Sequence, residues 1–83
     1  MYYVYILKSG LDEHLYIGYT TDLRKRIRHH QNGEVPSTKF RLPFELIFYE
    51  AYKSMADAKR KEKYLKTSKG KSSLHLMLRD SLK

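Results

Sequence analysis

Two short segments at the start of the chain are typical of β-strands, and the turn between them constrains the fold more than any other feature. Segments Tyr2–Lys8 and His14–Tyr19 are rich in aromatic and branched side chains, which suit a half-buried pleated surface. The Ser, Gly and Asp of Ser9–Glu13 are typical of a hairpin loop. The sequence therefore predicts an antiparallel hairpin. If Tyr5 pairs directly opposite Tyr16, the two rings share one face of the sheet.

Helical and strand signals continue along the chain. Thr20–Asp22 offers N-cap side chains for a helix over Leu23–Gln31, and Gly33 stands where a helix end favours a left-handed residue. A polar and basic loop over Gly33–Pro43 follows. The nearly continuous apolar content of Phe44–Tyr52 then predicts a central, well-covered third strand.

A second helix begins after Ser54, with Asp57 three residues on as a capping-box variant. Its expected inner stripe is Met55, Ala58, Glu62 and Leu65. The stretch Lys69–Ser72 predicts a turn, and the apolar residues of a short last helix are Leu74, Met77, Leu78 and Leu82. The predicted fold is α+β: one domain over residues 1–83, with a small three-stranded antiparallel sheet flanked by helices in the order β-β-α-β-α-α.

Charge indicates an anionic partner. Lysine and arginine number 17 against 9 acidic residues, which gives a net charge of +8 and an isoelectric point near 9.8. Such a chain attracts polyanions, nucleic acid first and an anionic membrane surface second. A basic domain that is merely soluble is the alternative. Without cysteine, disulfides, thiolate zinc sites and cysteine nucleophiles are excluded.

Targeting signals are not evident in the sequence. Residues 1–8 have neither the basic region nor the long apolar run of a secretory signal. No stretch approaches the roughly 20 apolar residues that span a bilayer. We therefore expect a cytoplasmic protein that does not enter membranes.

Five residues in these elements suggest phosphodiester cleavage. Tyr5 and Tyr16 supply phenols, and Tyr16 can take a proton from water once it has lost its own, which requires a nearby cation or a transient proton acceptor. Arg26 offers a planar donor fork for phosphate, and His30 lies one turn further along the same helical face. Glu62 is a hard oxygen ligand for Mg²⁺ or Mn²⁺, and Mg²⁺ commonly takes only one or two protein carboxylates.

Each residue also has an ordinary structural explanation. The two tyrosines suit core packing, Arg26 suits a snorkelling side chain, and His30 suits a cation near a helix end. An acid on an apolar stripe needs a partner, which for Glu62 is either a metal or a structural lysine or arginine. The functional prediction depends on all five residues occurring together.

The same residues belong to an ordered series that resembles the GIY-YIG nuclease superfamily. Its motifs most resemble the compact stand-alone branch of that superfamily, which consists of small proteins. The series runs through Tyr3-Val4-Tyr5, Tyr16-Ile17-Gly18, Leu23-Arg24-Lys25-Arg26, His30-Gln31-Asn32-Gly33, Ser37-Thr38-Lys39, Pro43, Tyr49-Glu50 and Glu62-Lys63. Tyr3 and Val4 stand where the family name has Gly and Ile.

The resemblance implies a metal-dependent endonuclease with a single Mg²⁺ or Mn²⁺ ion. It implies Tyr5, Tyr16, Arg26 and His30 as catalytic residues and Glu62 as the metal ligand. Nucleic acid is the implied partner, DNA in preference to RNA. The residues expected to bind it are Gly18, which matches the family glycine, and the loop cations Lys39, Arg41, Lys69 and Lys71.

An alternative prediction is a nucleic-acid-binding module with weak or lost catalysis. Many active members have an asparagine about a dozen residues after the glutamate, where this chain has Ser72, Ser73 and Leu74. The chain has no separate targeting domain. Specificity would therefore come from its basic loops or from a protein partner.

Overall fold

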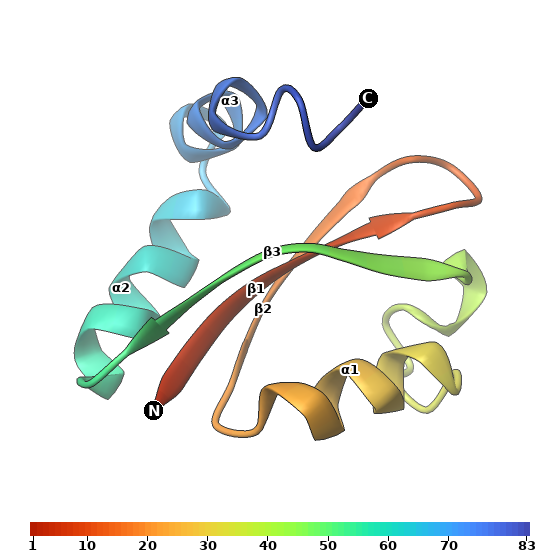
Figure 1. The fold of residues 1–83 in the computed structure, drawn as a ribbon, viewed down its shortest axis with the longest axis horizontal. Coiled ribbons are helices and arrows are strands. Elements are labelled where there is room, and N and C mark those ends of the chain that lie inside the picture. The colour runs from red at the N-terminus through yellow and green to blue at the C-terminus, as the bar shows by residue number, and fades with distance from the viewer.

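The computed structural model describes residues 1–83 and confirms the predicted α+β fold (Figure 1). The elements are β1 (Tyr2–Ser9), β2 (Leu15–Thr20), α1 (Leu23–Gln31), the short 3₁₀ helix η1 (Lys39–Arg41), β3 (Phe44–Tyr52), α2 (Met55–Leu65) and α3 (Ser68–Met77). The sheet has the order β2-β1-β3, and both strand pairs are antiparallel.

The central strand is β1, and the prediction that Phe44–Tyr52 is central was wrong. Four consecutive residues of β1, Val4 to Leu7, are buried, whereas Phe44 is the only buried residue of β3. Apolar content misled here because β3 lies at an edge of the sheet, with β1 as its one neighbouring strand, and its other side chains stay partly or largely exposed. The first strand of the chain therefore organises both layers of the core.

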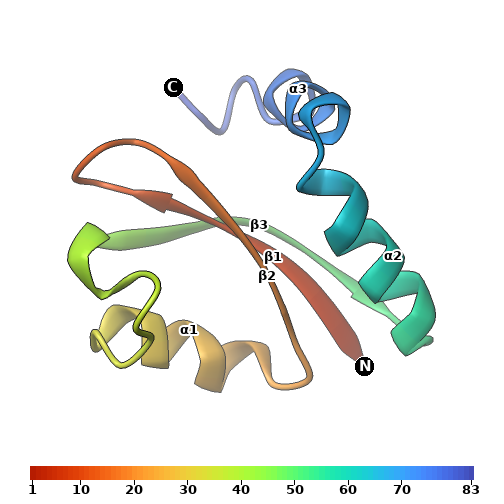
Figure 2. The same ribbon diagram turned by 180° about the vertical axis from the view of Figure 1, so that it is seen from behind.

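Helices cover both faces of the sheet, as Figures 1 and 2 show from opposite sides. On one face, α2 and α3 enclose a core cluster of Val4, Ile6, Ile17, Ala58, Leu65, Leu74 and Leu78. On the other face, α1 covers a smaller cluster of Tyr5, Leu7 and Phe44, with Tyr16, Leu23 and Ile27 packed against it. Side chains alternate across a strand, so β1 sends its even-numbered residues to the first layer and its odd-numbered residues to the second.

The hairpin register differs from the direct Tyr5–Tyr16 pairing by two residues. Tyr5 lies opposite Gly18, and Tyr16 lies opposite Leu7. A shift of two residues keeps every side chain on its own face. The two phenol rings therefore still share the α1 face, with ring centroids 6.3 Å apart.

The helix ends follow some of the predicted signals. Asp22 caps α1 by accepting a hydrogen bond from the Lys25 amide at 3.1 Å, and Gly33 has the expected positive φ of 74°. The Asp57 capping box was wrong, since this carboxylate binds Arg60 at 2.9 Å instead.

The predicted turn at Lys69–Ser72 was also wrong. Thr67 caps α3 through the Gly70 amide at 3.0 Å, so the helix begins at Ser68. None of the helices is long and apolar enough to cross a bilayer.

Candidate active site

A chain of hydrogen bonds crosses the layer between the sheet and α1. Arg26 donates from Nε to the Tyr5 hydroxyl at 3.3 Å, and that hydroxyl lies 2.8 Å from Nε2 of His30. Nδ1 of His30 lies 2.8 Å from Oγ1 of Thr38, which donates to the Val35 carbonyl. Because the Thr38 proton goes to Val35, its oxygen accepts from Nδ1–H. His30 therefore presents a bare Nε2 that accepts the Tyr5 proton.

Burial sets the protonation states along this chain. Tyr5 and His30 are both fully buried. Burial, with smaller contributions from Arg26 and His29, lowers the pKa of His30 to about 4, so the imidazole is neutral at pH 7. Burial also raises the pKa of Tyr5, although the hydrogen bond from Arg26 opposes this. The chain of contacts is therefore an array of neutral groups that ends in one cation, Arg26.

Gly18 makes room for the Tyr5 ring. A Cβ atom built on Gly18 would lie 2.3 Å from Cζ of Tyr5 and 2.4 Å from its hydroxyl oxygen. Any larger residue at position 18 would push the Tyr5 phenol away from His30. Gly18 is buried beneath this ring, so we interpret it as a packing residue, whereas the sequence suggested a nucleic-acid contact.

Tyr16 lies beside the same group but is only partly buried. Its ring centroid is 5.1 Å from that of His30, and its phenol helps to raise the pKa of Arg26, although the hydrogen bond with Tyr5 is the larger cause. Of the two phenols, only Tyr16 has access to solvent. The structure thus brings Tyr5, Tyr16, Arg26 and His30 together from β1, β2 and α1.

Glu62 approaches the β2 edge from the other layer. Lys59 lies three residues earlier on α2, with its Nζ 4.2 Å from the centre of the Tyr19 ring of β2. This side of α2 therefore faces the edge strand. Glu62 contributes electrostatically to the raised pKa of Tyr5. No hydrogen bond joins it to the other four residues. Its partner is Lys66, whose Nζ lies 3.0 Å from Oε2.

The expected burial of Glu62 on an apolar stripe was wrong. Its side chain is 19% exposed, and Met55 at the start of the stripe is 52% exposed. The buried residues of α2 are Ala58 and Leu65. Because the buried stripe consists only of Ala58 and Leu65, two turns apart, Met55 and Glu62 lie at its margins. A charged group at such a margin can reach water.

The donor atoms suit a metal that needs few protein ligands. No group of three or more His, Asp or Glu side chains could enclose an ion. A single accessible carboxylate fits Mg²⁺, which usually keeps several waters and takes further oxygens from a phosphate. Glu62 could hold such an ion if Lys66 gave up its ion pair.

The predicted phosphate-binding cations lie in two places. Lys39 and Arg41 are exposed in η1, close to Thr38 of the hydrogen-bond chain. Arg41 and Lys71 line one hollow of about 330 Å³ beside β2, together with His14 and His75. Lys69 is exposed in the first turn of α3 but does not line this hollow.

Thr38 was predicted only as part of the family series and Ser9 only as part of the hairpin loop, and both are buried. Thr38 fixes the His30 tautomer, and Ser9 donates from Oγ to the Arg41 carbonyl at 2.6 Å. The two hydroxyls carry no signal of these contacts in the sequence. Only the fold brings Thr38 to His30, 8 residues away in the chain, and Ser9 to Arg41, 32 residues away.

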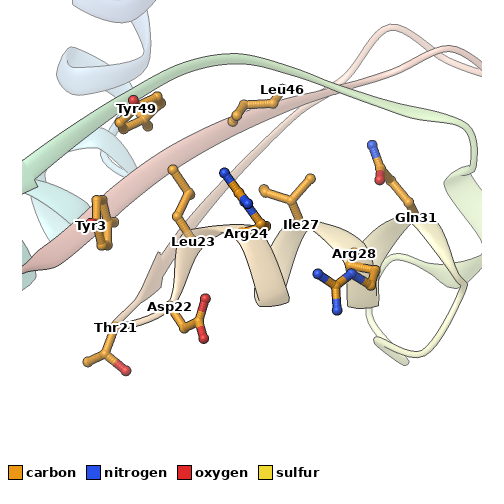
Figure 3. Close-up of a pocket in the computed structure, with 10 residues that line it drawn as sticks. All are labelled: Tyr3, Thr21, Asp22, Leu23, Arg24, Ile27, Arg28, Gln31, Leu46 and Tyr49. Carbon is orange, nitrogen blue, oxygen red and sulfur yellow. The ribbon is translucent and has the colours of Figure 1, made fainter.

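The largest cleft, of about 610 Å³, contains none of the five site residues. Figure 3 shows it on the flank of α1 that faces β3, with Arg24, Arg28 and Gln31 along the helix and Tyr3 and Tyr49 on the sheet. Arg26 and His30 lie on the opposite flank of α1, toward Tyr5 and Tyr16. We place the candidate site on that second flank because the chemistry-bearing groups meet there.

The chain is similar to known proteins over almost its whole length. A family model described as the GIY-YIG catalytic domain matches residues 1–75. A UPF0213 protein of Clostridium perfringens (strain 13 / Type A) is 39% identical over 84 aligned positions, which cover 100% of this chain and 89% of that protein. A UPF0213 protein of Streptococcus pyogenes serotype M5 (strain Manfredo) is 41% identical over 71 positions, covering 84% and 76%.

A solved structure is also similar. The solution NMR structure of the UPF0213 protein BH0048 from Bacillus halodurans is 37% identical, with a TM-score of 0.59 over 93% of this chain and 85% of that chain. The match to the family model includes all five residues of the candidate site. The chain therefore belongs to the GIY-YIG family of nuclease domains.

Proposed function

We propose that this protein is a metal-dependent endonuclease that cleaves phosphodiester bonds of nucleic acid, with DNA as the favoured substrate. The observation that carries the proposal is the hydrogen-bond chain from Arg26 through Tyr5 to His30, with the accessible Tyr16 beside it. Packing alone would not require the buried Tyr5 to hold Arg26 beside Tyr16, which is accessible to solvent.

Arg26 would hold the phosphate. Its Nε donates to Tyr5, and Tyr16 is a second, weaker neighbour of the guanidinium. The two terminal nitrogens are a pair of donors with the spacing of phosphate oxygens. Tyr5 and His30 would act as positioning residues because neither reaches solvent.

Tyr16 would act as a phenolate that takes a proton from the attacking water, after its own hydroxyl proton has passed to bulk water. It is the one phenol of the group that water can approach, and the neighbouring Arg26 cation would stabilise the phenolate. A neutral His30 adds no competing positive charge and keeps Tyr5 as a donor. When bound at Glu62, a Mg²⁺ or Mn²⁺ ion would supply charge neutralisation on the phosphate and a more acidic water.

Plasmid nicking by purified protein with Mg²⁺ and with Mn²⁺ tests the proposal. We expect metal-dependent nicking by the wild type and at least a roughly 100-fold loss in Glu62→Gln. Nucleic-acid affinity and melting temperature should change little, since a partly exposed ion pair contributes roughly 0–1 kcal/mol. Glu45→Gln, an exposed acid on β3, is the matched control and should nick normally.

Inactivity of the wild type in both metals, or normal nicking by Glu62→Gln, would contradict the enzyme proposal. The second candidate function, a binding module without turnover, is favoured by the ion pair between Glu62 and Lys66, which occupies the proposed ligand. A binding module predicts retained affinity without nicking. A protein partner that supplies specificity would show itself as nicking that is restricted to particular sites once the partner is added.

A further inference from the structure

The most exposed large apolar side chain of the molecule lies next to the candidate site. Phe40, in η1, is 79% exposed, whereas Phe44 is only 8% exposed. A phenyl ring left in water contributes nothing to folding, whereas a buried ring stabilises the folded protein. The Phe40 ring is therefore available for a contact outside the fold.

The ring is held outward by a well-anchored loop. On its N-terminal side, Thr38 is buried and bonded to His30. On its C-terminal side, the Arg41 carbonyl accepts from the buried Ser9 hydroxyl at 2.6 Å, and the Arg41 amide donates to Thr38 at 2.9 Å. Since both neighbours are fixed, Phe40 is not free to fold back onto the core.

The surroundings of the ring are positively charged. Lys39 lies with its Nζ 5.0 Å from the centre of the Phe40 ring, and Arg41 follows directly. Arg41 and Lys71 also line one hollow, whose lining includes the acid Glu13. Asp12 partly neutralises Arg41, with its Oδ2 3.8 Å from the arginine Nε. An aromatic face flanked by cations is the combination that binds single-stranded nucleic acid, with stacking for a base and charge for its phosphates.

We infer that Phe40 stacks on an unpaired nucleobase next to the site of cleavage, and that this contact directs the protein to substrates with single-stranded segments. The inference rests on the proposed function and names its substrate class. One ring is sufficient for such a contact because every base has a flat face. It is too small for a protein interface, since a buried ring covers about 150–250 Å² and a stable interface needs about 800 Å² on each partner.

The test compares binding of a blunt DNA duplex with binding of the same duplex carrying a single-stranded overhang. A 2-aminopurine in the overhang reports stacking through the loss of its fluorescence. We expect the wild type to bind the overhang duplex more tightly and to quench the probe. Phe40→Ala should lose about tenfold or more in affinity for the overhang duplex alone, and should not quench.

Two further variants separate stacking from general effects. Phe40→Tyr keeps a flat ring and should retain both affinity and quenching. Met55→Ala removes an exposed apolar side chain, 52% exposed at the start of α2, and should behave as the wild type. All three variants should melt within about 4 °C of the wild type, because changes at exposed positions have small effects on the stability of a domain of this size.

Each contrary outcome has its own meaning. If the wild type binds neither duplex at low salt, the proposed function fails and this inference with it. If it binds both duplexes and Phe40→Ala behaves as the wild type, only the inference about Phe40 fails. Phe40-dependent binding to vesicles of anionic lipid, without quenching of the probe, would assign the ring to a membrane surface and overturn the inference.

Discussion

The two phenols of the site differ in their access to water. Tyr5 is fully buried between Arg26 and His30, whereas Tyr16 is half-buried beside them. A buried phenol with two partners is a structural link, and removing its hydroxyl leaves Arg26 Nε and His30 Nε2 without that hydrogen bond. A phenol at the surface can exchange a proton with a substrate water. Burial, which the sequence does not display, thus separates the two roles.

Removing each hydroxyl should therefore have opposite consequences. We expect Tyr16→Phe to lower the rate of nicking by about 100-fold or more, as loss of a general base does, with little change in melting. Tyr5→Phe should lower the free energy of unfolding by about 1–3 kcal/mol, because Arg26 Nε and His30 Nε2 lose their partner. Paired denaturant melts and nicking assays on both variants measure this. Equal destabilisation by the two changes would contradict the assignment.

His30 makes stability depend on pH. Its pKa in the folded protein, about 4, lies below the ordinary value of 6.5, so the unfolded chain binds a proton more readily. The contribution of neutral His30 to the free energy of unfolding is complete above pH 6.5. It is lost as pH falls from 6.5 toward 4, by up to about 1.4 kcal/mol per pH unit. His30→Gln should flatten the stability curve in this window relative to wild type. His75→Gln, at an exposed position on α3, is the control and should keep the slope.

At the scale of elements, the contact between α2 and α3 depends on a residue without a side chain. Gly70 is buried in the first turn of α3, where an added Cβ would lie 2.0 Å from the Tyr64 carbonyl oxygen. The obstructing atom belongs to the backbone and is not free to move aside. The chain can therefore turn from α2 into α3 within two residues, which brings Leu74 onto the sheet.

Gly70→Ala should reverse the usual effect of this substitution. In an unobstructed helix, alanine is more stable than glycine by about 1 kcal/mol. Here we expect a loss of about 2 kcal/mol or more in the free energy of unfolding, from overpacking against backbone. Ser72→Ala, exposed in the same helix, is the control and should be neutral or slightly stabilising. A stabilised Gly70→Ala variant would show that the helices do not approach this closely.

For the whole molecule, a charge of +8 on 83 residues predicts binding that weakens steeply with salt. We expect Lys39→Gln to lower affinity and to reduce the slope of log affinity against log salt concentration by about 1, as loss of one phosphate contact does. Lys53→Gln is the control, because Lys53 follows the C-terminal end of β3, whereas η1 precedes its N-terminal end. Salt titrations of all three proteins measure this, and equal slopes would place Lys39 outside the interface.

Local patterns in the sequence were sufficient for the order of elements. Alternation of side chains, the Asp22 cap and the Gly33 helix end are short-range signals, so the hairpin, α1 and the α+β class could be predicted. Local reasoning failed where an element's surroundings mattered. The edge position of β3 depends on which strands pair, and pairing is a long-range choice that apolar content does not encode.

The site divides in the same way. Residue types and their order predicted Tyr5, Tyr16, Arg26, His30 and Glu62 as a group, because each carries a chemical group suited to phosphate or metal. Tertiary structure alone decided that Tyr5 and His30 are sealed from water, that Thr38 fixes the imidazole, and that Glu62 is paired with Lys66. The physical reason is that a side chain's chemistry is intrinsic, whereas its solvation and its partners are set by residues distant in the chain that folding brings into contact.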